Sequence, residues 1–122
     1  MAEGARGVLV VDDDPAIRAF VSELLADEGY EVKTAANGRD ALAVLASWRP
    51  DVILLDLMMP EMDGWAFLTR QQLDLELVRI PVIVMSASYN LRGGAGRIAA
   101  ADVVAKPFAI DQLLAKVEVL AS

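Results

Sequence analysis

The chain has 122 residues with 11 basic and 18 acidic side chains, a net charge of −7, no histidine and no cysteine. This length fits one domain around one core. The negative charge argues against a surface that neutralises nucleic-acid phosphates or an anionic membrane, and the missing cysteines exclude disulfides and thiolate chemistry. No apolar run approaches the roughly 20 residues of a membrane span, so we expect a cytoplasmic protein with no membrane contact and no direct nucleic-acid contact.

Short β-branched runs alternate with stretches at helical spacing along the whole chain. Such alternation is typical of a parallel sheet covered by helices on both faces, so we expect one compact α/β domain over residues 1–122, with no effector domain in this chain. The predicted strands are 8–12, 31–35, 51–56, 81–86 and 102–105.

Between these runs, the spacing predicts helices that each have one apolar side. The first spans 15–28, with Pro15 in its first turn, and the second spans 39–47. A third begins at Gly64, and the last runs over about 109–120. The apolar positions expected to face the core are Ile17, Phe20, Val21, Leu24, Leu25, Ala41, Leu42, Leu45, Phe67, Leu68, Leu113, Leu114 and Val117. Trp65, in the third helix, is expected to cover an edge of the core.

Carboxylate, hydroxyl and ammonium side chains stand where predicted strands end. Asp12 and Asp13 close the first strand, Asp56 the third, Ser86 the fourth, and Lys106 follows the fifth. Because ligand sites in such sheets form beyond the carboxyl ends of the strands, we expect these side chains to meet. Desolvated acids that meet repel one another by several kcal/mol unless Mg²⁺ or a lysine offsets the charge. The set therefore predicts a phosphoryl site with a divalent cation.

Four segments carry a family likeness: residues 11–14 (VDDD), 56–64 (DLMMPEMDG), 85–87 (MSA) and 106–108 (KPF). In order and spacing they resemble the receiver domains of bacterial two-component response regulators, such as chemotaxis regulators, and the likeness covers essentially the whole chain. It implies a doubly wound, flavodoxin-like sheet of five parallel strands in the order 2-1-3-4-5, flanked by about five helices. It also implies Mg²⁺ binding and transient phosphorylation of an aspartate by a histidine kinase or histidine phosphotransfer protein, in a signalling switch rather than an enzyme acting on outside substrates.

The resemblance also implies a role for each matching residue. Asp56 is expected to be the phosphoacceptor, with Lys106 and Ser86 contacting the phosphoryl group. Asp14 is expected to stay outside the site and cap the first helix. The expected metal ligands are Asp13 directly, Asp12 through water, Asp56, and the backbone carbonyl of Met58.

Two departures from the family pattern bear on signalling. Val103 stands where many receivers have an aromatic ring that turns inward, so we hypothesise that the output relies on repacking around Ser86 and Ala87 instead. Segment 90–97 contains three glycines, which lower helix propensity and predict a short or frayed fourth helix.

Other functional classes remain open. A metal-dependent phosphatase could also use an aspartate nucleophile and Mg²⁺, although Met58 stands where a second acid would be expected and no cap domain is visible. A flavin-binding electron carrier has a similar topology, but the loop at 12–15 (DDDP) repels phosphate. A phosphate-independent binding module is a further alternative.

Overall fold

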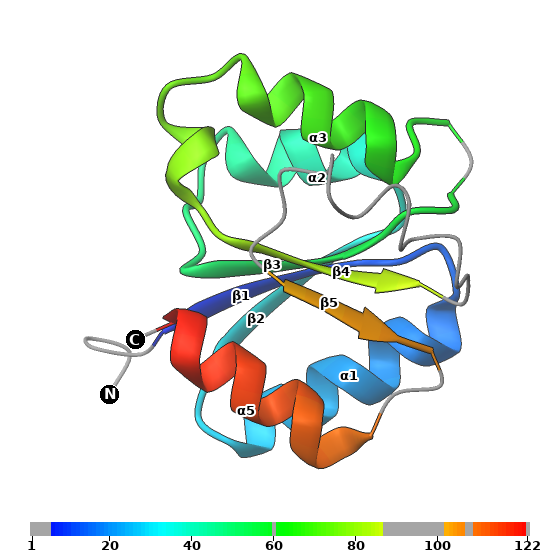
Figure 1. The fold of residues 1–122 in the computed structure, drawn as a ribbon, viewed down its shortest axis with the longest axis vertical. Coiled ribbons are helices and arrows are strands. Elements are labelled where there is room, and N and C mark those ends of the chain that lie inside the picture. Colours follow the sequence, from blue (N-terminus) through cyan, green and yellow to red (C-terminus); the bar gives the residue numbers. More distant parts are fainter. Residues whose placement is uncertain (1–5, 60, 87–101, 107–108, 122) are drawn as a thin grey trace.

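The structure is a computed structural model that describes residues 6–59, 61–86, 102–106 and 109–121. Its centre is a parallel sheet of five strands in the order β2-β1-β3-β4-β5, which confirms the expected topology (Figure 1). Predicted and observed boundaries agree within about two residues, the usual uncertainty of element ends. The strands are β1 (Gly7–Val11), β2 (Glu31–Ala35), β3 (Val52–Asp56), β4 (Val82–Ser86) and β5 (Asp102–Ala105).

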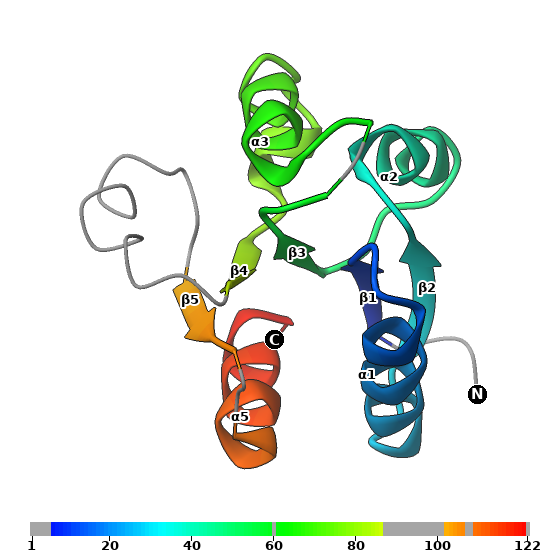
Figure 2. The ribbon, with the colours of Figure 1, turned by 90° about the vertical axis from the view of Figure 1, so that its right-hand side faces the viewer.

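Helices cover both faces of this sheet, as Figure 2 shows: α1 and α5 lie on one face, and α2 and α3 lie on the other. The described part of the chain contains four α-helices and one short 3-10 helix, η1, against the five or so helices expected. The predicted fourth helix at 90–97 lies outside the described residues. The helices are α1 (Pro15–Asp27), α2 (Gly38–Leu45), α3 (Gly64–Gln72), α5 (Ile110–Ala121) and η1 (Leu77–Arg79).

Alternate strand residues build two separate cores because successive side chains point to opposite faces of the sheet. In β1, Leu9 and Val11 pack with α2 and α3, whereas Val8 and Val10 pack with α1 and α5. Every residue of β1 and β3 is buried, as expected of central strands in a sheet with two covered faces. The sheet is thereby fixed from both sides, and the ends of β1 and β3 are held in place.

Polar side chains cap the starts of three helices. Asp14 accepts a hydrogen bond from the backbone N–H of Ala16 at 2.9 Å, which confirms its expected capping role. Asn37 accepts from Asp40 N–H at 2.8 Å to open α2, and Asp63 caps α3 in the same way. The first helix therefore begins directly after the run of three acids, without an intervening loop.

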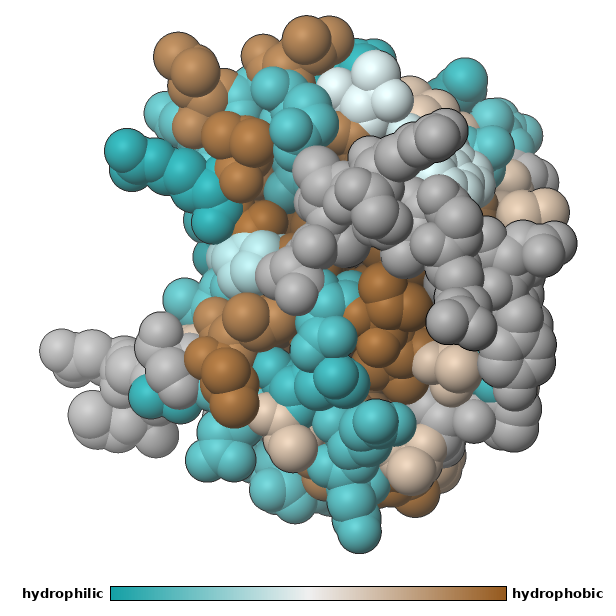
Figure 3. All heavy atoms as spheres, in the orientation of Figure 1, coloured by the Kyte–Doolittle hydropathy of each residue, from teal (hydrophilic) through white to brown (hydrophobic). Residues whose placement is uncertain are grey.

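One aromatic side chain was predicted to face the core and does not: Phe20 is 50% exposed on α1. Trp65 is 43% exposed on α3, which fits a residue at the edge of the core. In α1 the buried positions are Val21 and Leu25, one turn apart, and Phe20 lies about 100° round the helix from Val21. Large apolar side chains are also exposed after α3 ends, at Leu73 and Leu75, and Figure 3 shows brown surface over this upper part of the molecule.

The start of α3 lies against the end of β3. Gly64 donates its N–H to the carbonyl of Leu57 at 3.0 Å. A Cβ at Gly64 would lie 2.6 Å from the carbonyl oxygen of Asp56 and 2.6 Å from Leu57 Cα, so only glycine fits between these backbone atoms. This contact sets where the chain turns after Asp56.

We therefore expect Gly64→Ala to lower the free energy of unfolding by more than about 2 kcal/mol, because the backbone must shift to admit the methyl group. The control is Gly29→Ala: Gly29 has a φ of +97° but open space around it. That change should cost only about 1 kcal/mol of backbone strain. Urea denaturation compares the two variants, and equal losses would contradict the packing argument.

Candidate functional site

Three carboxylates meet at the carboxyl ends of β1 and β3. Asp12 and Asp13 follow β1 directly, and Asp56 is the last residue of β3. One oxygen from each lies within 4.8 Å of the other two. Asp12 is fully buried and Asp56 is 6% exposed, whereas Asp13 is exposed. The sequence-based expectation that these acids converge is thus confirmed in space.

Asp12 is held by hydrogen bonds at each of its polar atoms. Its N–H donates to the carbonyl of Ala35 in β2 at 3.1 Å. Its Oδ1 accepts from the N–H of Asp14 at 2.9 Å, and its Oδ2 accepts from Lys106 Nζ at 2.7 Å. Its backbone carbonyl accepts from a guanidinium nitrogen of Arg18 at 2.7 Å. Sequence reasoning missed Arg18, although an arginine in the second turn of a helix that follows an acidic run is a visible signal.

Lys106 brings a positive charge from the end of β5 into the acidic cluster. Its Nζ lies 2.7 Å from Asp12 Oδ2 and 3.7 Å from Asp56 Oδ1. The side chain of Lys106 is 16% exposed, so its attraction to the two acids is only partly screened by water. The lysine was expected beside Asp56, and the structure places it against both acids, closer to Asp12.

Burial and the charge of Asp12 raise the pKa of Asp56 from its ordinary value of 3.8 to about 6. The charge of Asp13 acts in the same direction, while Lys106 and a hydrogen bond from Met58 N–H, 3.3 Å long, act against the rise. The pKa rises overall because desolvation and repulsion by the other acids outweigh the attraction to Lys106 and the hydrogen bond from Met58. A cation that entered this cluster would favour ionised Asp56.

Two further predicted site residues adjoin the cluster. Met58 directs its N–H to Asp56, while its side chain is 72% exposed. Ser86 ends β4 opposite Ala105 of β5, and its neighbour Met85 is paired with Asp56. The backbone therefore brings Ser86 to the same edge of the sheet as the acids, and the direction of its hydroxyl group remains a prediction.

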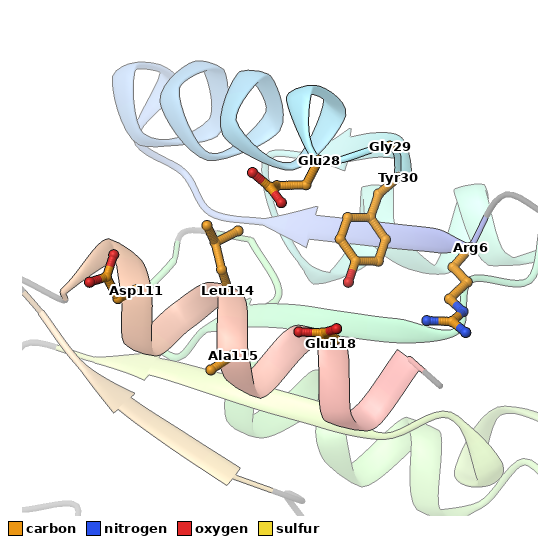
Figure 4. Close-up of a pocket in the computed structure, with 8 residues that line it drawn as sticks. All are labelled: Arg6, Glu28, Gly29, Tyr30, Asp111, Leu114, Ala115 and Glu118. Atoms are coloured by element: carbon orange, nitrogen blue, oxygen red, sulfur yellow. The ribbon is translucent and has the colours of Figure 1, made fainter.

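A separate cavity of about 610 Å³ lies between α5 and the turn that follows α1 (Figure 4). It reaches Arg6 and Tyr30, next to the starts of β1 and β2, and includes none of the predicted site residues. Burial raises the pKa of Tyr30, and the nearby charge of Glu118 adds to this rise. The lining mixes one basic and several acidic side chains, and the acidic cluster is a different site.

A parallel sheet of this order with acids and a lysine at its carboxyl edge is the arrangement expected of a phosphorylation-dependent signalling switch. The sequence model of the response regulator receiver domain matches residues 8–118. The response regulator MprA of Mycolicibacterium vanbaalenii is 40% identical over 115 residues, which are 93% of this chain and 49% of MprA. The chain belongs to the family of response regulator receiver domains, which act in two-component signalling.

Solved structures of receiver-type proteins share the fold. The chemotaxis response regulator CheY4 of Vibrio cholerae aligns with a TM-score of 0.87 and 34% identity, over 95% of this chain and 98% of CheY4. The response regulator TrrA of Thermotoga maritima, determined in complex with Mg²⁺–BeF, aligns with a TM-score of 0.84 and 35% identity, over 94% of this chain and 98% of TrrA. The likeness thus extends over nearly the full length of both structures.

The chain spans about half the length of the curated relative MprA and less of some others. Two relatives, RpaA and NtrC, are named as DNA-binding regulators. The expectations that residues 1–122 carry no effector domain and make no nucleic-acid contact therefore stay predictions. Within the described residues, no helix combines the length and the apolar character that crossing a bilayer requires.

The raised pKa of Asp56 predicts a pH dependence of stability. Between pH 3.8, the ordinary value, and about 6, the folded protein binds more protons at Asp56 than the unfolded chain does, so this group makes stability fall as pH rises. Above that window the loss of stability should level off at about 3 kcal/mol in the absence of Mg²⁺. Thermal unfolding between pH 4 and 8 in EDTA measures this loss of stability.

Asp56→Asn is the control for this prediction because the amide does not titrate. At pH 7.5 without metal this variant should be more stable than the wild type. Identical pH profiles for the two proteins would show that Asp56 is not the group responsible.

Proposed function

We propose that this chain accepts a phosphoryl group on Asp56 from a phosphohistidine of a histidine kinase or histidine phosphotransfer protein, with Mg²⁺ bound at the acidic cluster. The phosphorylated form then presents an altered surface to a downstream protein. The observation that carries the proposal is the position of Asp56: a nearly buried carboxylate at a strand end, 3.7 Å from an ammonium and beside two further acids. The family match favours this switch over a phosphatase, a flavin carrier or a phosphate-independent module.

In the proposed reaction, a carboxylate oxygen of Asp56 attacks the phosphorus atom in line with the bond to the histidine nitrogen. The new O–P bond gives an acyl phosphate, the N–P bond breaks, and the imidazole nitrogen keeps the electron pair and takes up a proton from solvent. The nucleophile needs no general base, because a carboxyl group with a pKa of about 6 is mostly ionised at neutral pH. Positioning and charge neutralisation then supply the catalysis.

Lys106 is proposed to bind a phosphoryl oxygen once the group has been transferred. Its ammonium already lies between Asp12 and Asp56, so it needs only a small movement to reach an anionic group on Asp56. We assign the hydroxyl of Ser86 as a second donor to that group, supported by the place of Ser86 at the end of β4 beside β3. Self-catalysed loss of the phosphoryl group by hydrolysis belongs to the same proposal.

The donor set fits Mg²⁺, which prefers carboxylate and carbonyl oxygens and keeps several of its waters. We propose Asp13 and Asp56 as direct ligands, with the backbone carbonyl of Met58. Both carboxylate oxygens of Asp12 already accept hydrogen bonds, from Asp14 N–H and Lys106 Nζ, which supports contact through water for this acid. When bound, the ion would neutralise charge on the acceptor and on the incoming phosphoryl oxygens. The TrrA structure, with Mg²⁺–BeF, supports this assignment by analogy.

The partners in this proposal are proteins: a phosphohistidine donor and a downstream target. We place the chain in the cytoplasm because the ATP that kinase domains use is found there. We expect no direct contact with nucleic acid or membrane. The net charge of −7 supports that expectation.

Mass spectrometry tests the acceptor directly. Incubation with Mg²⁺ and acetyl phosphate or phosphoramidate should add one phosphoryl group to the wild type and to Asp27→Asn, a control change at an exposed acid. Asp56→Asn should gain none, and wild type in EDTA should gain at least about tenfold less in the same time, since the acids then repel the donor. A phosphorylated Asp56→Asn would refute the assignment.

Removing the charge of Lys106 should expose its role as an internal counterion. We expect Lys106→Met to lower the free energy of unfolding by about 2–4 kcal/mol in EDTA, because fully buried Asp12 loses its partner. Saturating Mg²⁺ should restore more stability to this variant than it adds to the wild type.

Lys116→Met is the matched control for this prediction. Lys116 Nζ lies 2.8 Å from Asp102 Oδ2, but this pair is more exposed than Lys106 and Asp12. The loss in the free energy of unfolding should therefore stay below about 1 kcal/mol. Mg²⁺ should not act differently on this variant than on the wild type. If Mg²⁺ raised the melting temperature of all three proteins equally, the counterion role of Lys106 would be disproved.

A further inference from the structure

The proposed function leaves one contact at the acidic cluster without a role. Arg18 lies in the second turn of α1 and is only partly exposed. Its guanidinium donates a 2.7 Å hydrogen bond to the backbone carbonyl oxygen of Asp12, six residues earlier. This oxygen belongs to the peptide that joins Asp12 to Asp13, so the bond acts on the backbone between two of the three clustered acids.

The Asp12–Asp13 peptide decides where the carboxylate of Asp13 lies. Asp12 itself is fixed by Ala35, Asp14 and Lys106, whereas the Asp13 side chain is exposed. Rotation of the intervening peptide would leave Asp12 nearly in place and swing the Cα–Cβ bond of Asp13 away from the cluster. A short hydrogen bond to the carbonyl opposes that rotation because it fixes the direction of the C=O group.

The contact of Arg18 is with a backbone dipole and not with a carboxylate. In the described part of the chain, no acid lies within ion-pair distance of Arg18, whereas Lys106 lies within that distance of both Asp12 and Asp56. The two cations at this site therefore act differently: Lys106 supplies charge to the acids, and Arg18 directs the backbone that carries two of them.

We propose that Arg18 is a positioning residue for metal binding, which orients the Asp12–Asp13 peptide so that the Asp13 carboxylate stays within reach of a cation shared with Asp56. The inference rests on the proposed function, because it assigns Arg18 to the Mg²⁺ site of the phosphoacceptor. Groups that orient metal ligands without touching the metal commonly change its affinity 10–100-fold when they are removed, so the effect should be measurable.

Charge and position make opposite predictions for this residue. If Arg18 mattered only through its positive charge, removing it would make the site more negative and Mg²⁺ would bind more tightly. If it directs the peptide, removing it lets Asp13 leave the cluster and Mg²⁺ binds more weakly. The sign of the change in affinity therefore separates the two roles.

Isothermal titration with MgCl₂ provides the measurement. Arg18→Met keeps most of the apolar stem and should bind Mg²⁺ about tenfold more weakly than the wild type. Arg18→Lys keeps a charged donor and should recover part of that loss. Arg70→Met removes an exposed arginine from α3 and should leave the affinity unchanged. Equal or tighter binding by Arg18→Met overturns the inference.

A second readout separates positioning from unfolding. In ¹H–¹⁵N NMR spectra, Arg18→Met should shift the backbone amide of Asp13, because that amide shares a peptide with the carbonyl that loses its donor. Dispersed peaks from the rest of the sheet show that the variant is folded, and an unmoved Asp13 peak overturns the inference.

If the Met variant does not fold, Arg18→Lys serves instead and should give a smaller shift of the same peak. If the wild type takes up no Mg²⁺, the proposed function is refuted, and this inference with it. If the wild type binds Mg²⁺, the difference between it and the Arg18 variants tests the role of Arg18 alone.

Discussion

Three carboxylates share one edge of the sheet, and their mutual repulsion governs the chemistry of this domain. The acids are brought together by the fold: β1 and β3 are central strands, buried on both faces, and their ends cannot separate without exposing two apolar cores. Burying like charges costs free energy, and a raised pKa at Asp56 is the sign that the cost is not fully offset. Hydrophobic packing thus holds an electrostatically unfavourable arrangement in place, as is common for functional sites.

The surrounding contacts divide into those that supply charge and those that supply direction. Lys106 contributes the positive charge from the neighbouring end of the sheet, through a 2.7 Å contact to Asp12. Backbone groups supply most of the direction: the N–H of Asp14 and the carbonyl of Ala35 hold Asp12, and the N–H of Met58 binds Asp56. The close approach of Gly64 to the backbone of Asp56 fixes the chain on the far side of the acceptor. Asp12 and Asp56 are therefore buried and held by several contacts, whereas Asp13 is exposed to solvent.

Much of this arrangement was predictable because it depends on short-range patterns. The β-branched runs indicate the strands, and the rule that parallel strands place their carboxyl ends at one edge brings together Asp12, Asp56 and Lys106 from the sequence alone. Asp14 was predictable as a cap because a short acidic side chain before a proline-led helix has a local partner. Each of these inferences needs only residues that are close in sequence, together with one topological rule.

The errors and omissions concern properties that depend on distant neighbours. Phe20 falls on the apolar side of its helix by spacing, yet the width of the buried stripe on a helix depends on what packs opposite it, and Phe20 is half exposed. The preference of Lys106 for Asp12 over Asp56 arises from a difference of about an ångström in side-chain placement, which no sequence pattern encodes. The place of Arg18 after the acidic run is visible in the sequence, but its partner is not, since every residue offers a backbone carbonyl and only the three-dimensional path of the helix selects one.

The single ammonium shared by two acids ties two equilibria together. Lys106 lies 2.7 Å from Asp12 and 3.7 Å from Asp56, so under the proposed function an anionic group on Asp56 would draw it away from Asp12. Asp12 would then need another counterion, and occupancy of the acceptor and of the cation position would favour each other. Thermodynamic reciprocity requires that the factor by which the phosphoryl group tightens ion binding equals the factor by which the ion favours the acyl phosphate. Under the proposed function, the free magnesium concentration would therefore set the level of signalling output without any change of residue.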